Sequence, residues 1–464
     1  MRPAPPAACP VAPPTWSWRA GLAWLLHWPA RAPRTGRLAA VALVLPTMLA
    51  IQFYVHLGRG PWTGYRPFGD FFAFWSWSAM THMLVHPLAL YTPATVQAFL
   101  QGEQPLFHGH YPFAYPPSFL LVIWPLALAP RLLAYVVWSA VGLGAYLAAT
   151  MEAPWRRPIA VLLVLAPATG LTLQTGQDGL LLAALLIGGC RLLGRRPVLA
   201  GVLLGLAACK PQFGLLVPLA LLAACQWRAI AAATATVLAS VLASAAAFGW
   251  AMWGRWITAL WGLSGFVAGN KRLHTLMPTV TGSLHLMGAG PVARTLAQIA
   301  VGLIAAICVW LCWRRGPGRL ASAALLAGCF LATPYAFCFD LPILNGALLA
   351  IVLERIEADA AFGLWEFPLL FAAAVLPWLM ADSHTNVPWA AFVLPPLFAL
   401  IVTRALRRGP PGAVACAPGD RTPEPRARRD QPAIRRPEPG RSPNTPSPNL
   451  ASAPGATARN AGYS

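Results

Sequence analysis

The sequence has 464 residues, of which 57% are hydrophobic and only 10% are charged, and its formal net charge is +20. A soluble globular domain carries roughly 25% charged residues, so this chain has too few charges to cover a water-facing surface. The composition excludes an ordinary soluble domain and predicts an integral membrane protein. The basic residues lie in links and tails and form no compact basic domain, which argues against nucleic acid as a partner.

The N-terminal region, residues 1–37, is rich in Pro and Trp and does not have the order of a cleavable signal peptide. The first long apolar run, residues 38–57, follows Arg31, Arg34 and Arg37. Because basic residues favour the cytoplasmic side, we interpret this run as a retained signal anchor. Residues 1–37 are then a cytoplasmic segment.

Apolar runs recur along the rest of the chain, and several are shorter than the roughly 20 residues that one helical span needs. Short runs interrupted by proline indicate broken or re-entrant helices beside a cavity. We predict an all-α polytopic bundle of about ten to thirteen transmembrane helices. The runs are 38–57, 117–130, 132–150, 158–173, 177–193, 198–209, 211–227, 229–250, 292–313, 319–333, 338–353, 364–381 and 388–404.

Basic links between the runs set the predicted orientation. With the arginine-rich links in the cytoplasm, residues 58–116, 251–291 and 381–388 lie outside, and the first of these forms a partly helical outer loop. Residues 406–464 are rich in Pro and Arg and nearly free of large apolar side chains. They are predicted to form a disordered cytoplasmic tail.

Asp70 is the most conspicuous carboxylate on the predicted outer side. It stands among aromatic residues about a dozen positions after the first span. A carboxylate at a membrane surface is expensive and is a functional candidate by default. We interpret Asp70 as a candidate general base, with an N-cap of the helix that starts at Phe71 as the alternative.

The same outer loop contains His108, His110 and Tyr115. Two histidines at alternate positions with no third ligand predict no metal site. Cysteines elsewhere in the chain show no metal-binding spacing either. Hydrogen bonding to a polar substrate is the better use of this loop, and Tyr115 is a candidate for it.

Polar residues also interrupt the apolar runs. Gln177 and Asp178 can bind sugar hydroxyls or cap a helix, and Tyr335 and Asp340 mark another broken span edge. Lys210 needs an anion at that depth. A substrate phosphate and an internal pairing with Asp178 or Asp340 are equally plausible partners.

Lys271, Arg272 and His274 form a basic group in a region predicted to lie outside. Positive charge there runs against the usual trend. Phosphate binding and an ordinary solvated loop are both consistent with this group.

In this order, the motifs resemble glycosyltransferase family 87, the polyprenyl-phosphate-mannose-dependent mannosyltransferase-like proteins of the GT-C superfamily, over residues 38–405. No motif is specific alone, but the ordered set in its membrane context is. The motifs are Gly69-Asp70-Phe71, Tyr115-Pro116-Pro117, Gly176-Gln177, Ala200-Gly201 leading to Lys210-Pro211, and Thr333-Pro334-Tyr335 through Asp340.

The resemblance implies an inner-membrane (plasma-membrane) hexosyltransferase with an active site facing the periplasm. The expected donor is a polyprenyl-phosphate sugar with mannose as the first candidate, the acceptor is a glycolipid, glycan or protein, and the transfer is inverting. Asp70 would be the base. The resemblance leaves open whether a divalent cation assists, and no other cofactor is expected. The family often has Asn where Asp178 stands and His where Tyr335 stands, so the sugar is left open.

Two other classes of function compete with this one. A transporter or flippase of lipid-linked sugars would also have broken spans, but it would predict inverted repeats, and the sequence shows no internal repeat. A membrane scaffold is the third hypothesis, and it requires that Asp70 be dispensable.

Overall fold

The structure is a computed structural model, and it describes residues 69–83, 87–105, 111–152, 156–358, 360, 362–381 and 386–407. Several predictions lie outside these described residues. They are the cytoplasmic segment 1–37, the first span 38–57, the pair His108 and His110, and the tail from residue 408 onward.

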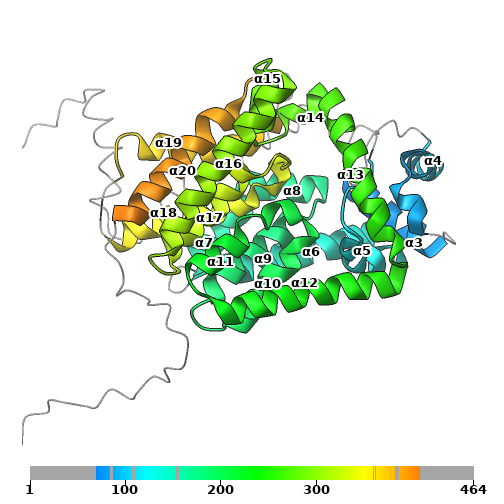
Figure 1. Ribbon diagram of the computed structural model, residues 1–464, viewed down its shortest axis with the longest axis horizontal. Coiled ribbons are helices and arrows are strands. Elements are labelled where there is room, and N and C mark those ends of the chain that lie inside the picture. Colours follow the sequence, from blue (N-terminus) through cyan, green and yellow to red (C-terminus); the bar gives the residue numbers. More distant parts are fainter. Residues whose placement is uncertain are drawn as a thin grey trace, which may run out of the picture. The chain divides into compact units, whose positions relative to one another are not determined.

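Every regular element in the described ranges is helical, as the sequence predicts (Figure 1). The α-helices are α3 (Phe71–Met83), α4 (Pro93–Glu103), α5 (Pro117–Ile123), α6 (Arg131–Thr150), α7 (Arg156–Leu165), α8 (Pro167–Thr175), α9 (Gly179–Leu192), α10 (Pro197–Leu206), α11 (Val217–Ala223), α12 (Trp227–Phe248), α13 (Ala251–Gly269), α14 (Lys271–Thr275), α15 (Val280–Leu286), α16 (Pro291–Trp313), α17 (Arg319–Ala332), α18 (Pro342–Glu357), α19 (Glu366–Ala381) and α20 (Trp389–Arg407). Short 3₁₀ turns are η1 (Pro87–Tyr91), η2 (Trp124–Leu128), η3 (Ala207–Cys209), η4 (Pro211–Phe213) and η5 (Cys338–Asp340).

The short apolar runs are broken helices, as predicted. The run 158–173 is divided into α7 and α8, which meet at Pro167. The run 117–130 is divided into α5 and η2, with Pro125 at the start of η2. Proline has no N–H to donate and clashes with the preceding turn, so the α-helix before each of these residues cannot continue through it.

Four of the described helices are long and apolar enough to cross a membrane by themselves: α6, α12, α16 and α20. They have 20, 22, 23 and 19 residues, and a span needs about 20. The chain therefore has the helices of a membrane protein. The predicted total of ten to thirteen spans stays a prediction.

Residues 251–291, predicted only as an outer connection, contain the 19-residue helix α13. Its indoles attach it to neighbouring elements, since Trp256 Nε1 donates to the carbonyl oxygen of Ala114 at 3.2 Å and Trp253 Nε1 donates to Ser244 Oγ at 3.3 Å. Aromatic side chains with one polar atom suit a membrane interface. The basic residues predicted for an open loop follow this helix directly, in α14.

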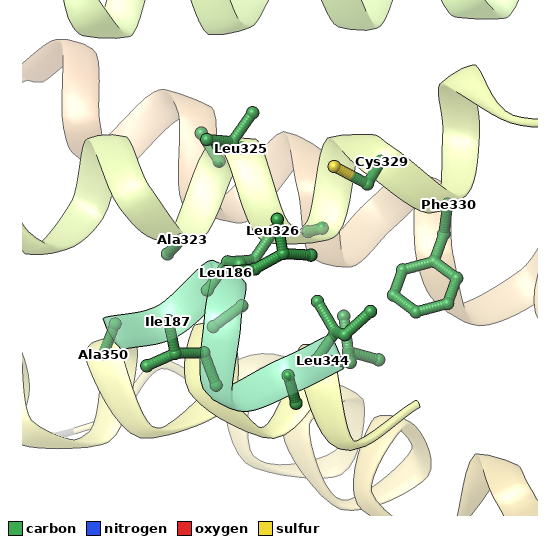
Figure 2. Packing of buried hydrophobic residues seen from close by; sticks show 14 of the residues in the cluster. Leu186, Ile187, Ala323, Leu325, Leu326, Cys329, Phe330, Leu344 and Ala350 are labelled. Carbon is green, nitrogen blue, oxygen red and sulfur yellow. The ribbon is translucent and has the colours of Figure 1, made fainter. Parts of the chain in front are cut away.

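The main core is formed where α9, α17 and α18 pack against one another. Figure 2 shows Leu186 and Ile187 of α9 facing Leu326 of α17 and Leu344 of α18. Lipid is as apolar as these side chains, so close packing rather than transfer out of water holds such helices together. Each of the three helices has the polar residues considered below at one end.

Ion pairs gather at the other end of the same helices. The basic links between the apolar runs meet there. The pairs are Glu152 with Arg191 (3.4 Å) and Arg319 (2.8 Å), Glu357 with Arg319 (2.5 Å), Glu354 with Arg404 (3.2 Å), and Glu366 with Arg355 (3.1 Å) and Arg404. The 14 residues of α9 separate Asp178 from this end by about 20 Å, at 1.5 Å per residue.

Candidate active site

Asp70 lies in the turn before α3 and is half-buried. Its backbone oxygen accepts the hydrogen bond of Ala73 N–H at 3.0 Å, which starts the helix. Its carboxylate is used elsewhere: Tyr111 Oη–H donates to Oδ1 at 2.6 Å, and Gln177 Nε2–H donates to Oδ2 at 3.0 Å. The carboxylate therefore joins distant segments of the chain.

The turn at Gly176 brings Gln177 to Asp70. Gly176 ends α8 in the left-handed conformation, with φ of +68°, which glycine adopts without strain. A Cβ at this position would lie only 2.4 Å from Phe71 Cβ. Glycine thus serves twice here, since it reverses the chain and lets α8 approach the start of α3.

Lys210 lies between two carboxylates. Its Nζ is 2.6 Å from Asp178 Oδ1 and 2.7 Å from Asp340 Oδ1, and Phe337 N–H donates to Asp340 Oδ2 at 3.0 Å. We call Asp178, Lys210 and Asp340 the buried ion cluster, because their exposed fractions are 2%, 5% and 1%. Of the two partners predicted for Lys210, the structure has the internal carboxylates. It also decides that the Asp178 side chain does not cap α9.

Close backbone packing assembles the buried ion cluster. The start of α9 lies against η5, where a Cβ on Gly179 would be 1.9 Å from the carbonyl oxygen of Phe339. Thr172 Oγ1–H donates to that same oxygen at 2.8 Å. The Phe339 ring lies beneath Lys210, with 5.3 Å between Nζ and the ring centroid, which adds a cation–π contact.

Tyr115 lies between Gln177, which binds Asp70, and Asp178 of the buried ion cluster. Its hydroxyl lies 3.4 Å from Asp178 Oδ1 and 3.5 Å from Gln177 Oε1, at the long limit for a hydrogen bond. Its ring stacks on Phe119 with centroids 4.0 Å apart. Burial, and after it the charge of Asp178, hold the pKa of Tyr115 well above its ordinary value. The hydroxyl stays protonated and available as a donor.

The other predicted site residues lie beside this group. Tyr335 is half-buried, and its backbone is held by Thr333, whose Oγ1 accepts the N–H of Tyr335 at 3.1 Å. Lys271 and Arg272 are exposed on α14, whereas His274 is buried. The carbonyl oxygen of Leu276, just after α14, accepts the N–H of Cys338 at 2.8 Å, so α14 adjoins η5.

A partly open recess with about 330 Å³ of empty space adjoins these residues; Thr172, Gln177 and Asp178 line it together with Trp138 and apolar residues of α6 and α9. A second cavity of about 860 Å³, between α7, α18 and α19, has Asn345 as its polar residue among apolar side chains. Of these two cavities, the first is the one that borders Gln177 and Asp178.

Sequence reasoning missed four residues of this region: Tyr111, His285, Arg294 and Phe339. Tyr111 lies in the same tyrosine-rich loop as Tyr115, but nothing in the sequence distinguishes it as the partner of Asp70. The other three become visible only once helices are placed side by side. In the described ranges no group of three or more His, Cys, Asp or Glu side chains is arranged to hold a metal ion.

Comparison with known families decides what this arrangement belongs to. Residues 113–334 match the profile of glycosyltransferase family 87. This segment is similar to that family, and it makes up just under half of the chain. Curated proteins and solved structures gave no match. The family 87 match confirms the resemblance predicted from the sequence, and it indicates a membrane-associated glycosyltransferase with a sugar donor and an acceptor as substrates.

The family 87 segment covers part of the site. It includes Tyr115, Gln177, Asp178, Lys210 and the basic residues of α14, whereas Asp70, Tyr335 and Asp340 lie outside it. The hydrogen bond from Gln177 to Asp70 and the ion pair of Lys210 with Asp340 attach those outlying carboxylates to the matched segment.

Proposed function

We propose that the chain transfers a hexose, with mannose as the first candidate, from a polyprenyl-phosphate donor to a glycolipid, glycan or protein acceptor. The reaction takes place on the periplasmic side of the inner membrane and inverts the anomeric centre. Asp70 is the general base. The observation that carries the proposal is the half-buried Asp70 carboxylate, held by Tyr111 and by Gln177 of the family 87 segment.

The chemistry requires one base and one site for a leaving phosphate. The acceptor hydroxyl gives its proton to the Asp70 carboxylate as its oxygen forms a bond to the anomeric carbon. The bond from that carbon to the phosphate oxygen breaks, and its electron pair stays with the polyprenyl phosphate. One donor on each oxygen fixes the orientation of the Asp70 carboxylate and leaves lone pairs to accept the proton.

The buried ion cluster has a positioning role in this proposal. Lys210 is already neutralised by two carboxylates, so it is a poor ligand for the phosphate. With Asp178 and Asp340 it holds α9 and η5 together, and Gln177 and Tyr115 present their polar groups to the sugar. Binding of the phosphate is assigned to the basic group of Lys271, Arg272 and His274, and Tyr335 borders the sugar.

The test is transfer of a radiolabelled sugar from a panel of polyprenyl-phosphate donors by membranes containing wild type or Asp70→Asn. We expect the variant to transfer about a hundredfold to ten-thousandfold more slowly, as befits loss of a general base. Glu103→Gln is the matched control, since Glu103 is an accessible carboxylate paired with Arg131 at 3.0 Å. It should keep wild-type transfer. Equal turnover by wild type and Asp70→Asn would exclude this role.

A further inference from the structure

Five basic residues belong to α14, α15 and α16, which pack in series, α14 against α15 and α15 against α16. We call this group the cationic corner: Lys271, Arg272 and His274 of α14, His285 of α15 and Arg294 of α16. The sequence contains no Asp or Glu between Asp178 and Asp340. The segment that forms the cationic corner therefore contributes no carboxylate of its own.

Two imidazoles form the floor of the cationic corner. The rings of His274 and His285 stack with centroids 3.6 Å apart and planes within 7°. Burial lowers the pKa of both histidines, and for His285 the neighbouring His274 and Arg294 lower it further. Both rings are therefore neutral at neutral pH, and the positive charge belongs to Lys271, Arg272 and Arg294.

The guanidinium of Arg294 orients the histidine beside it. Arg294 Nη1 is hydrogen-bonded to His285 Nδ1. Because arginine only donates, Nδ1 is the acceptor and the proton of neutral His285 is on Nε2. His274 Nδ1 is hydrogen-bonded to the backbone oxygen of Asn270 at 3.0 Å, so it too has a fixed tautomer with its proton on Nδ1.

The position of the Arg294 guanidinium is electrostatically unfavourable without a bound anion. Its Nε is buried and has no hydrogen-bond partner in the described part of the chain. It also stands in the first turn of the 23-residue helix α16, where the helix dipole is positive and disfavours a cation. A buried unpaired donor and a cation at that helix end are both relieved by a bound anion.

The cationic corner is held in place before any ligand arrives. Thr281 N–H and Oγ1–H both donate to Gln298 Oε1, at 3.2 and 3.1 Å. Gln298 Nε2–H in turn donates to the carbonyl oxygen of Leu331 at 2.8 Å. Gln298 lies one helical turn after Arg294, so these bonds fix α15, α16 and α17 relative to one another beside the basic groups.

The cationic corner also adjoins the candidate active site. The hydrogen bond from Cys338 N–H to the carbonyl oxygen of Leu276 joins the end of α14 to η5. Asp340 of the buried ion cluster lies in the same short turn, η5. A ligand with its phosphate on the cationic corner is therefore next to the buried ion cluster.

We propose that Arg294 and His285, together with Lys271, bind the phosphate of the lipid donor and hold it as it leaves, while His274 supports the His285 ring by stacking on it. This assignment rests on the proposed function. The donor is a phosphodiester with one negative charge, and breaking its sugar–oxygen bond leaves a phosphate monoester with a second one. Arg294 and His285 Nε2–H donate to that growing charge, and such donors lower the barrier because their preference is for the product-like anion.

Binding of farnesyl phosphate to the purified full-length protein tests this without any transfer step. We expect Arg294→Gln to weaken binding of farnesyl phosphate at least tenfold and His285→Gln at least threefold, while binding of farnesol is unchanged. Arg255→Gln is the matched control, because Arg255 is exposed on α13, and its affinity should stay within twofold of wild type. Thermal unfolding identifies which variants are folded.

Wild-type affinity for farnesyl phosphate in either folded variant, Arg294→Gln or His285→Gln, would overturn the assignment. An equal loss in Arg255→Gln would also overturn it, because the effect would then be one of general charge. Failure of the proposed function looks different. Wild-type protein would then bind farnesyl phosphate through the cationic corner and yet transfer no sugar from any polyprenyl-phosphate donor.

Discussion

The buried ion cluster and the cationic corner are adjacent, but charge is paired within the first and unpaired in the second. In the buried ion cluster, one ammonium lies between two carboxylates, and all three side chains are at most 5% exposed. In the cationic corner, three cations and two neutral imidazoles are supplied by a segment without a carboxylate. A charge balanced by the chain itself holds structure together, whereas an unbalanced cationic group beside a buried unpaired donor is suited to bind a ligand.

Lys210→Met tests the structural side of this comparison and has the largest expected effect on stability. It leaves two carboxylates buried without their cation, which costs about 3–5 kcal/mol for a broken buried pair. Thermal unfolding in detergent should show the loss, and the yield of folded protein should fall. Glu103→Gln, which breaks the exposed pair with Arg131, should cost about 1 kcal/mol or less.

A triple variant separates charge from shape in the same cluster. Asp178→Asn, Lys210→Met and Asp340→Asn together remove all three charges, so most of the stability lost in Lys210→Met should return. If Lys210→Met alone unfolds like wild type, the cluster is not structural, and Lys210 becomes available again as a phosphate ligand.

Gly176→Ala tests whether the turn that brings Gln177 to Asp70 requires glycine. Alanine would be strained at a φ of +68° and its Cβ would lie 2.4 Å from Phe71 Cβ, so we expect a loss of about 2–4 kcal/mol. Gly144 of α6 has open space around it, and Gly144→Ala should be neutral or stabilising by up to about 1 kcal/mol. Equal unfolding temperatures for the two variants would contradict this account of the turn.

Tyr111→Phe has the smallest expected effect. It removes one hydrogen bond to the Asp70 carboxylate, and a bond to a charged group contributes about 1.5–3 kcal/mol. Part of that loss should appear as a roughly tenfold lower kcat with little change in unfolding temperature. Tyr135→Phe is the control, because its hydroxyl donates to the carbonyl oxygen of Leu173 at 2.6 Å away from Asp70. A kcat that falls equally in both variants would mean that Tyr111 has only a packing role.

The helices were largely predictable, because apolar composition and proline positions are local properties of the chain. The runs 229–250 and 292–313 correspond closely to α12 and α16, and the break at Pro167 follows from the chemistry of proline. Helix α13 was not predicted, since its many tryptophans and glycines resemble a surface connection in sequence. Packing of its indoles on Ala114 and Ser244 stabilises it.

The candidate site was predictable as a set of residues but not as a geometry. Rarity selected Asp70, Asp178, Lys210 and Asp340, because few charges occur near apolar runs. Rarity could not choose between a substrate phosphate and internal carboxylates as the partner of Lys210. That choice depended on how close α9 and η5 approach, which residues more than 150 positions apart determine together.

The sequence by itself indicated the membrane class, most of the helical segments and the family, because hydropathy and motif order do not depend on folding. Only the tertiary structure decided that Lys210 is neutralised, that Tyr111 and Gln177 hold Asp70, and that Arg294 meets two stacked histidines. Electrostatic balance depends on distances of a few ångströms between side chains. Those distances exist only after distant helices have packed.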